Sequence, residues 1–237
     1  MNNFENIIST LHANANPNTV KGMEHYGIKV LKAFGVSLPF LRDIAKHYQN
    51  DHPLAIQLWD SGFHEARMLA TMVDDASQVT EEQMEAWVLD FDSWDICDQC
   101  CSNLFDKTPF ALKKLMEWTF RDEEYVKRAG FVMMACLAVH STNLPDTVFE
   151  GFLPVIVRES TDPRNFVCKA VNWALRQIGK RDMILYAKAL EISRTLANST
   201  DKTARWIGND AVKELQGTTA IKRMLKKDNL LKDTREK

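Results

Sequence analysis

Glycine and proline are scarce in this chain of 237 residues, which contains nine glycines and seven prolines. Runs of alternating β-branched residues joined by Asn-Gly or Asp-Gly turns, which would predict β-hairpins, are also lacking. These two absences argue against fold classes built on antiparallel sheets. Helical periodicity fills the chain instead, so we expect an all-α protein.

Long apolar runs are lacking as well. The segment AGFVMMACLAV (129–139) is far shorter than the roughly 20 residues of a membrane span, and Arg128 and His140 bracket it. The first residues, MNNFENIIST, show no basic segment followed by an apolar one, so we expect no secretory signal. The five cysteines are odd in number and clustered, which favours reduced thiols. We therefore expect a cytoplasmic protein that does not contact membranes.

Positive charge is not in excess, because the formal net charge is −2. This balance argues against a protein that coats nucleic acid non-specifically, but it leaves room for a local basic surface. None of the six histidines lies four residues from another. The sequence therefore predicts no metal site, no catalytic triad and no cofactor.

Prolines and capping residues divide the chain into helices. Thr80 and Gln83 have the capping-box spacing before an apolar stretch. Six prolines are predicted to separate helices: Pro39, Pro53, Pro109, Pro145, Pro154 and Pro163.

A weak internal repeat is visible in charged-then-apolar segments about 30 to 40 residues apart. These segments are HEARMLATMV (64–73), SWDICDQCC (93–101), VKRAGFVMMA (126–135), VCKAVNWALR (167–176) and ARWIGNDAV (204–212). They predict one domain over 1–237, a superhelical solenoid of HEAT-like helical hairpins with a concave inner face. A compact irregular helical bundle is the alternative. Residues 222–237 are charged and are expected to form the end of a last helix and a tail.

One helix is predicted to carry a tryptophan within a basic stripe. On a helical wheel of residues 167–180, Val167, Val171, Ala174 and Ile178 form the core face. Lys169, Trp173, Arg176 and Lys180 fall on the opposite side. This arrangement suits a surface that meets phosphates and a flat or cationic partner. The alternative is that Trp173 packs on a neighbouring helix beneath the lysine stems.

The segment FDSWDICDQCC (91–101) places cysteines and acidic residues on different faces. Cys97, Cys100 and Leu104 form the apolar side, whereas Trp94 and Asp98 share another face with Asp95 at its margin. The cysteines are therefore expected in the core, and a single Cys-x-x-Cys without a second pair argues against zinc. Trp94 and Asp98 remain as candidates for chemistry.

Arg128 and Trp206 complete the set of candidates. Arg128 begins an otherwise apolar helix, so we expect it either to pair with a carboxylate such as Asp98 or to face an anion. Trp206 is expected to lie off the core face, in a weaker form of the pattern around Trp173.

These segments, in this order, resemble the AlkD-type DNA glycosylases built from HEAT-like repeats. The matching stretches are GMEHYGIKVLKAFGVSLPFLR (22–42), SWDICDQ (93–99), VKRAG (126–130) and VCKAVNWALRQIGK (167–180), which together extend over most of the chain. The resemblance implies a solenoid that holds duplex DNA in its concave face. It also implies hydrolysis of the N-glycosidic bond of cationic N3- or N7-alkylated purines without base flipping.

The resemblance assigns a role to each matching residue. Asp98 corresponds to the catalytic carboxylate, and Trp94 and Trp173 to the aromatic pair that contacts the deoxyribose of the lesion. Tyr26 corresponds to a tyrosine near the lesion strand, and Arg128 to an arginine that holds a phosphate. The expected partner is double-stranded DNA with alkylated bases, bound by a monomer, with Lys169, Arg176 and Lys180 as further DNA contacts.

This sequence departs from the family pattern at Ser93, where a second tryptophan is expected, and in a longer segment around STNLPD (141–146). Two other functions therefore stay open. One is a non-catalytic relative that binds DNA structures, and the other is a protein-binding helical scaffold.

Overall fold

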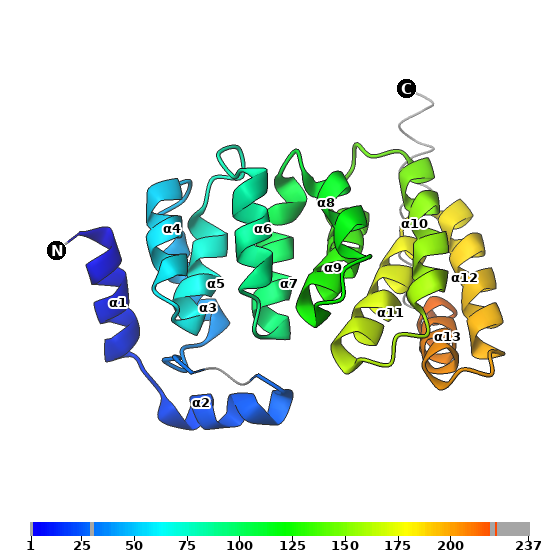
Figure 1. Cartoon of the computed structure of the whole chain (residues 1–237), viewed down its shortest axis with the longest axis horizontal. Coiled ribbons are helices and arrows are strands. Elements are labelled where there is room, and N and C mark those ends of the chain that lie inside the picture. Colours follow the sequence, from blue (N-terminus) through cyan, green and yellow to red (C-terminus); the bar gives the residue numbers. More distant parts are fainter. Residues whose placement is uncertain (1, 29–30, 219–220, 222–237) are drawn as a thin grey trace. The chain divides into compact units, whose positions relative to one another are not determined.

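A computed structural model describes residues 2–28, 31–218 and 221, and over this part the chain is helical without a β-strand (Figure 1). The α-helices are α1 (Asn3–Ala13), α2 (Pro17–Met23), α3 (Leu38–Ala45), α4 (His52–Asp60), α5 (His64–Val73), α6 (Glu81–Leu89), α7 (Trp94–Asn103), α8 (Ala111–Trp118), α9 (Glu124–His140), α10 (Asp146–Glu159), α11 (Asn165–Gly179), α12 (Met183–Ala197) and α13 (Lys202–Leu215). Two short 3₁₀ helices are η1 (Glu24–Tyr26) and η2 (Phe105–Lys107). The predicted all-α class is confirmed. Across the described residues, no helix combines the length and apolar character of a membrane span.

The chain forms two compact units, Met1–Lys114 and Leu115–Lys237. The charged tail predicted over 222–237 lies outside the described residues.

Side-chain caps start several helices, among them the one that the sequence predicts at Thr80. Thr80 Oγ1 accepts a hydrogen bond from the backbone N–H of Gln83 at 3.1 Å, which satisfies one of the amides that a helix start leaves unpaired. Asn2 and Glu5 form a full capping box at the start of α1. Four other helices, α2, α4, α12 and α13, begin with an N-cap side chain that accepts a hydrogen bond from a backbone N–H. These N-cap residues are Asn16, Asp51, Asp182 and Asp201.

The prediction for the prolines is right at helix boundaries and wrong at Pro154, which lies inside α10. An internal proline removes one helical hydrogen bond and costs about 3 kcal/mol. The helix continues because it buries one face, formed by Phe149, Phe152, Leu153, Val155 and Ile156. Burial of each large apolar side chain contributes roughly 1.5–3 kcal/mol, so together they outweigh the local cost.

In the first unit, α5 packs against α3, α4 and α7. Figure 1 shows α2 running crosswise to α4 and α5. The core contains Trp59 and Trp87, whose rings stack with centroids 4.0 Å apart. The indole N–H of Trp59 donates to Asp90 at 2.8 Å, so the buried ring keeps a polar partner.

In the second unit, α11 packs against α9, α10, α12 and α13. The helix α9 is buried almost all round, as its sequence predicts. Two glycines permit close helix contacts. A Cβ atom at Gly130 would lie 2.9 Å from the carbonyl oxygen of Leu115, and one at Gly208 would lie 2.5 Å from that of Ser193. Only residues without a side chain fit these contacts.

The five recurring segments of the sequence lie on α5, α7, α9, α11 and α13, which are alternate helices in chain order. Hydrogen bonds join successive members of this series within each unit. His64 of α5 bonds to Asp95 of α7, and Asn172 of α11 bonds to Asp210 of α13. The repeat therefore reflects a set of structurally equivalent helices.

Candidate functional site

The first turn of α7 holds Trp94 in a defined position. Ser93 is the N-cap residue, and Trp94, the first residue of the helix, is half-buried. Its indole Nε1–H donates to the backbone carbonyl of Tyr26 at 3.0 Å, across 68 residues of sequence. The Tyr26 side chain itself is 68% exposed. The structure thus brings together two of the residues that the family resemblance assigns to the lesion strand.

Asp98 lies one helical turn after Trp94 and is also half-buried. Residues four apart on a helix share a face, so the indole and the carboxylate are neighbours on α7. Cys97, Cys100 and Cys101 are fully buried on the other side, which confirms that they are core residues. Burial raises the pKa of the Cys100 thiol well above its ordinary value.

The structure reveals a histidine–carboxylate pair that the sequence does not predict. His64 Nε2 lies 2.9 Å from Asp95 Oδ2, and the His64 side chain is only 3% exposed. Burial favours a raised pKa for Asp95, but its hydrogen bond and charge interaction with His64, with a further bond from the Ile96 amide, hold the pKa below its ordinary value. The only signal in the sequence is that both residues stand at the start of a repeat helix, 31 residues apart.

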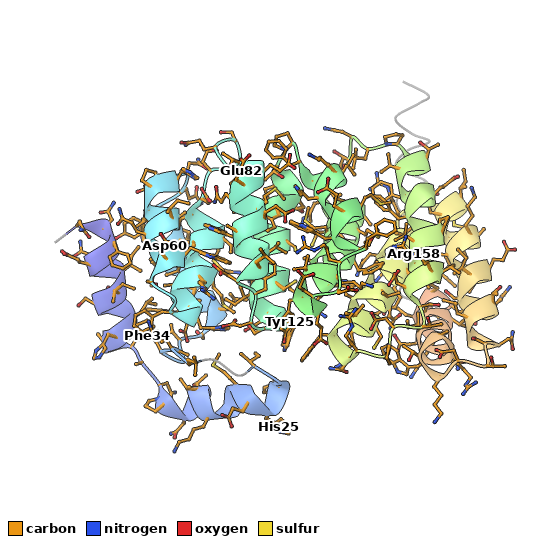
Figure 2. All side chains as sticks on the ribbon, in the orientation of Figure 1. His25, Phe34, Asp60, Glu82, Tyr125 and Arg158 are labelled. Carbon is orange, nitrogen blue, oxygen red and sulfur yellow. The ribbon has the colours of Figure 1, made fainter. Side chains whose placement is uncertain are left out.

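Glu65, the next residue of α5, is a second polar group that sequence reasoning missed. It is 2% exposed, and its carboxylate accepts backbone hydrogen bonds from Phe34 (2.8 Å), Gly35 (2.5 Å) and Val36 (3.2 Å). Figure 2 labels Phe34, whose carbonyl accepts from Asn16 at the start of α2. Glu65 thereby anchors residues 34–36, just before α3.

In the second unit, Arg128 is buried near the start of α9, with 5% of its surface exposed. Its Nη1 donates to the backbone carbonyl of Phe166, in the first turn of α11, at 2.6 Å. The guanidinium therefore connects the starts of α9 and α11.

Trp173 is half-buried on α11. The Gln177 side-chain amide is oriented so that its oxygen faces hydrogen-bond donors. Gln177 Oε1 then accepts from Trp173 Nε1 at 2.9 Å and from Lys180 Nζ at 3.3 Å. Like Trp94, this tryptophan has its indole N–H held by a nearby carbonyl oxygen. Trp206 on α13 is 44% exposed, which confirms that it lies off the core face.

The basic stripe on α11 is engaged with α13. Arg176 and Lys180 both form ion pairs with Glu214, and Arg176 lies 3.7 Å from Asp210. Burial favours a raised pKa for Glu214, but Lys180 and Arg176 hold the pKa below its ordinary value. Lys169 is exposed. The sequence placed these cations on one face, but it gave no indication that acidic residues of α13 partly neutralise them.

No group of three or more histidine, cysteine or acidic side chains suited to a metal ion occurs among the described residues.

The fold and these side chains define an all-α protein of HEAT-like helix pairs in which indoles and a carboxylate stand on repeat helices. The model of the family described as DNA alkylation repair enzyme matches residues 7–215, and the chain belongs to this family.

Two similar proteins come from Listeria. Uncharacterized protein Lmo0209 of Listeria monocytogenes serovar 1/2a is 25% identical over 216 residues, which cover 89% of this chain and 92% of the relative. Uncharacterized protein Lin0241 of Listeria innocua serovar 6a is 24% identical over 197 residues, which cover 81% and 86%.

A solved structure has the same fold, with a TM-score of 0.74 and 18% identity over 89% of this chain and 94% of that one. It is described as representing "a new family of proteins related to the HEAT-like repeat DNA glycosylases with affinity for branched DNA structures". The HEAT-like architecture predicted from the sequence is confirmed.

Proposed function

We propose that this protein is a monofunctional DNA glycosylase that hydrolyses the N-glycosidic bond of cationic N3- or N7-alkylated purines in duplex DNA, without base flipping. It acts as a cytoplasmic monomer. Asp98 is the catalytic carboxylate, Trp94 and Trp173 contact the deoxyribose, and Tyr26 lies near the lesion strand. Arg128 holds a backbone phosphate, with Lys169, Arg176 and Lys180 as further DNA contacts.

The chemistry of the substrate explains why one carboxylate is enough. An alkylated purine already carries a positive charge, so it leaves without protonation by a general acid. The remaining sugar resembles an oxocarbenium ion, which a carboxylate stabilises while it positions a water molecule. Indole faces stabilise the same developing charge. Ordinary glycoside hydrolysis needs a second carboxylic acid because its leaving oxygen would otherwise depart as an alkoxide anion.

One observation carries the proposal: the Trp94 indole, fixed by the Tyr26 carbonyl, stands one helical turn from Asp98 on the same face of α7. This pairing supplies an aromatic surface and a negative charge within reach of one sugar. Membership of a DNA alkylation repair family supports the same substrate class.

The test measures free base released from DNA methylated at N7 of guanine and N3 of adenine. Asp98→Asn is expected to lower release over the spontaneous rate by about 100-fold or more, because a stabilising charge is lost from the transition state. DNA affinity is expected to stay within a few-fold of wild type. Asp60→Asn is the matched control, because Asp60 is an exposed carboxylate at the end of α4 in the same unit (Figure 2). Equal release by wild type and Asp98→Asn would refute the catalytic role.

A second candidate is a non-catalytic protein that binds branched DNA. The structural relative with affinity for branched DNA favours it, as does Ser93 in place of a second tryptophan. This candidate expects no base release and tighter binding to a four-way junction than to a linear duplex of the same length.

A further inference from the structure

A pocket of about 290 Å³ in the first unit is lined in part by Trp94, and none of its other lining residues takes part in the chemistry described above. Most of its wall is apolar, and Met23 and Met68 belong to this apolar part. Ligand pockets for drug-sized molecules occupy roughly 300–1,000 Å³, so this one suits a single small ring system.

The polar side of the pocket is built from a buried histidine and a half-buried carboxylate. His64 and Asp95 both line it and are joined by their 2.9 Å hydrogen bond. His64 is 4% exposed, and its Nδ1 atom has no hydrogen-bond partner. Burial of an unpaired N–H is costly, so the tautomer with the proton on Nε2 is favoured and His64 donates to Asp95. The carboxylate keeps further acceptor positions, because each oxygen can accept more than one hydrogen bond.

Two further side chains give the pocket an aromatic wall and an amide. The Trp94 ring lines it and is held by the hydrogen bond to the Tyr26 carbonyl. Gln99 lines it one turn after Asp95, and its Oε1 accepts from Asn103 at 3.3 Å. The Gln99 Nε2 group can therefore donate a hydrogen bond to a ligand in the pocket.

We propose that this pocket binds one methylated purine base, the product that the proposed glycosylase releases. The inference rests on the proposed function. In that reaction the C1′–N bond breaks and its electron pair passes to the purine nitrogen, which discharges the positive charge of the base. Water supplies the hydroxyl group at C1′ and loses one proton. The product is therefore a flat, neutral base.

The donors and acceptors of such a base match those of the pocket. Its exocyclic amino group, and in 7-methylguanine also the ring N1–H, donate to the Asp95 carboxylate, whereas its ring nitrogens, or the carbonyl of 7-methylguanine, accept from Gln99 Nε2. Its faces stack on Trp94, and the added methyl group packs against Met23 and Met68, with apolar burial that favours the methylated base over the unmodified one.

Calorimetric titration with free 3-methyladenine and 7-methylguanine tests the site without DNA. Wild type is expected to bind, and Gln99→Leu to bind about fivefold to tenfold more weakly, because it loses one hydrogen bond at similar side-chain size. Gln57→Leu, at an exposed glutamine of α4, is the matched control and is expected to bind as wild type does. No binding, or equal binding by Gln99→Leu, would overturn the proposal.

A second measurement uses the unaltered protein. In methyl NMR spectra, added base is expected to shift the signals of Met23 and Met68, whereas Met133 and Met134, buried on α9, stay in place. Shifts confined to other methionines would also overturn the proposal. Base release is measured separately. If release occurs but free base does not bind, only the pocket assignment fails; if base binds without release, the pocket remains and the glycosylase proposal fails.

Discussion

His64 Nε2 lies 2.9 Å from Asp95 Oδ2, and the two residues are separated by 31 positions in the chain. The hydrogen bond joins the first residue of α5 to the second residue of α7. Trp94 precedes Asp95 directly, and Asp98 follows it by one turn. The pair therefore fixes the helix start that carries the proposed aromatic contact and carboxylate.

Asp95→Asn is expected to lower the free energy of unfolding by about 1–3 kcal/mol at pH 7, because a charged hydrogen-bond acceptor is replaced by a neutral one. The pKa of Asp95 is lower in the folded protein than its ordinary value, so its ionised form stabilises the fold. That contribution is complete above the ordinary pKa of about 3.9 and is lost as the pH falls through the folded value. Denaturant unfolding from pH 7 to pH 3 measures the difference.

The matched control for this change is Asp92→Asn, because Asp92 is an exposed carboxylate 3.8 Å from Arg67 in the same unit. This substitution is expected to change the free energy of unfolding by no more than about 0.5 kcal/mol. A difference between wild type and Asp95→Asn that remained constant from pH 7 to pH 3 would contradict the stabilising role of the ionised Asp95 carboxylate.

Glu65→Gln is expected to destabilise the first unit by about 2–4 kcal/mol. The carboxylate accepts three backbone amides, and an amide side chain offers only one oxygen, so buried N–H groups lose their partner. Hydrogen exchange at Phe34, Gly35 and Val36 is expected to accelerate. Glu82→Gln, at an exposed glutamate in the first turn of α6, is the control (Figure 2). Unchanged protection of the three amides would show that Glu65 does not hold this segment.

Helices and their faces could be predicted from sequence because both follow from local periodicity. The wheel of α7 correctly separated the buried Cys97 and Cys100 from Trp94 and Asp98. Pro154 shows where local rules fail, because burial of one helix face keeps α10 intact across a proline.

Contacts between repeats could not be predicted in the same way. His64 meets Asp95 after 31 residues, whereas Arg176 meets Glu214 after 38. Loops of different length alter this spacing, so a period of about 30 to 40 residues cannot identify the partner of a given side chain. The acidic residues that pair with the basic stripe of α11 could not be predicted, because the pairing depends on how α13 is aligned along α11.

Gly208→Ala is expected to destabilise the second unit by about 1–3 kcal/mol, the range for overpacking. A Cβ atom there would meet backbone atoms of α12, including Ala197 N and Ser193 O, and backbone cannot move aside as a flexible side chain can. Gly151→Ala in α10 is the matched control, because nothing lies within 4 Å of its Cβ position. The control substitution is expected to raise the free energy of unfolding by up to about 1 kcal/mol, since alanine favours the helical conformation more than glycine does. Thermal unfolding measures the stability of both variants. Equal changes in stability would contradict the close contact of α12 with α13.

Glu214→Gln is expected to strengthen DNA binding about threefold to tenfold near 100 mM salt. Arg176 and Lys180 both pair with Glu214, so a phosphate must compete with this carboxylate for them. Removal of its charge frees Lys180 and leaves Arg176 with only the longer 3.7 Å contact to Asp210, so both cations become more available to phosphate. Each new phosphate contact steepens the dependence of log affinity on log salt by about 0.9. Binding of a fluorescent duplex across a salt series measures both quantities.

Glu150→Gln separates this local effect from net charge. Glu150 pairs with Lys188 at 2.6 Å between α10 and α12, so the variant loses the same charge while it leaves the basic stripe unchanged. A general electrostatic effect would raise affinity equally in both variants and leave the salt slope almost the same. A larger gain and a steeper slope in Glu214→Gln alone would identify Arg176 and Lys180 as DNA contacts, because only that variant releases them. Equal behaviour of the two variants would remove both residues from the proposed DNA-binding surface.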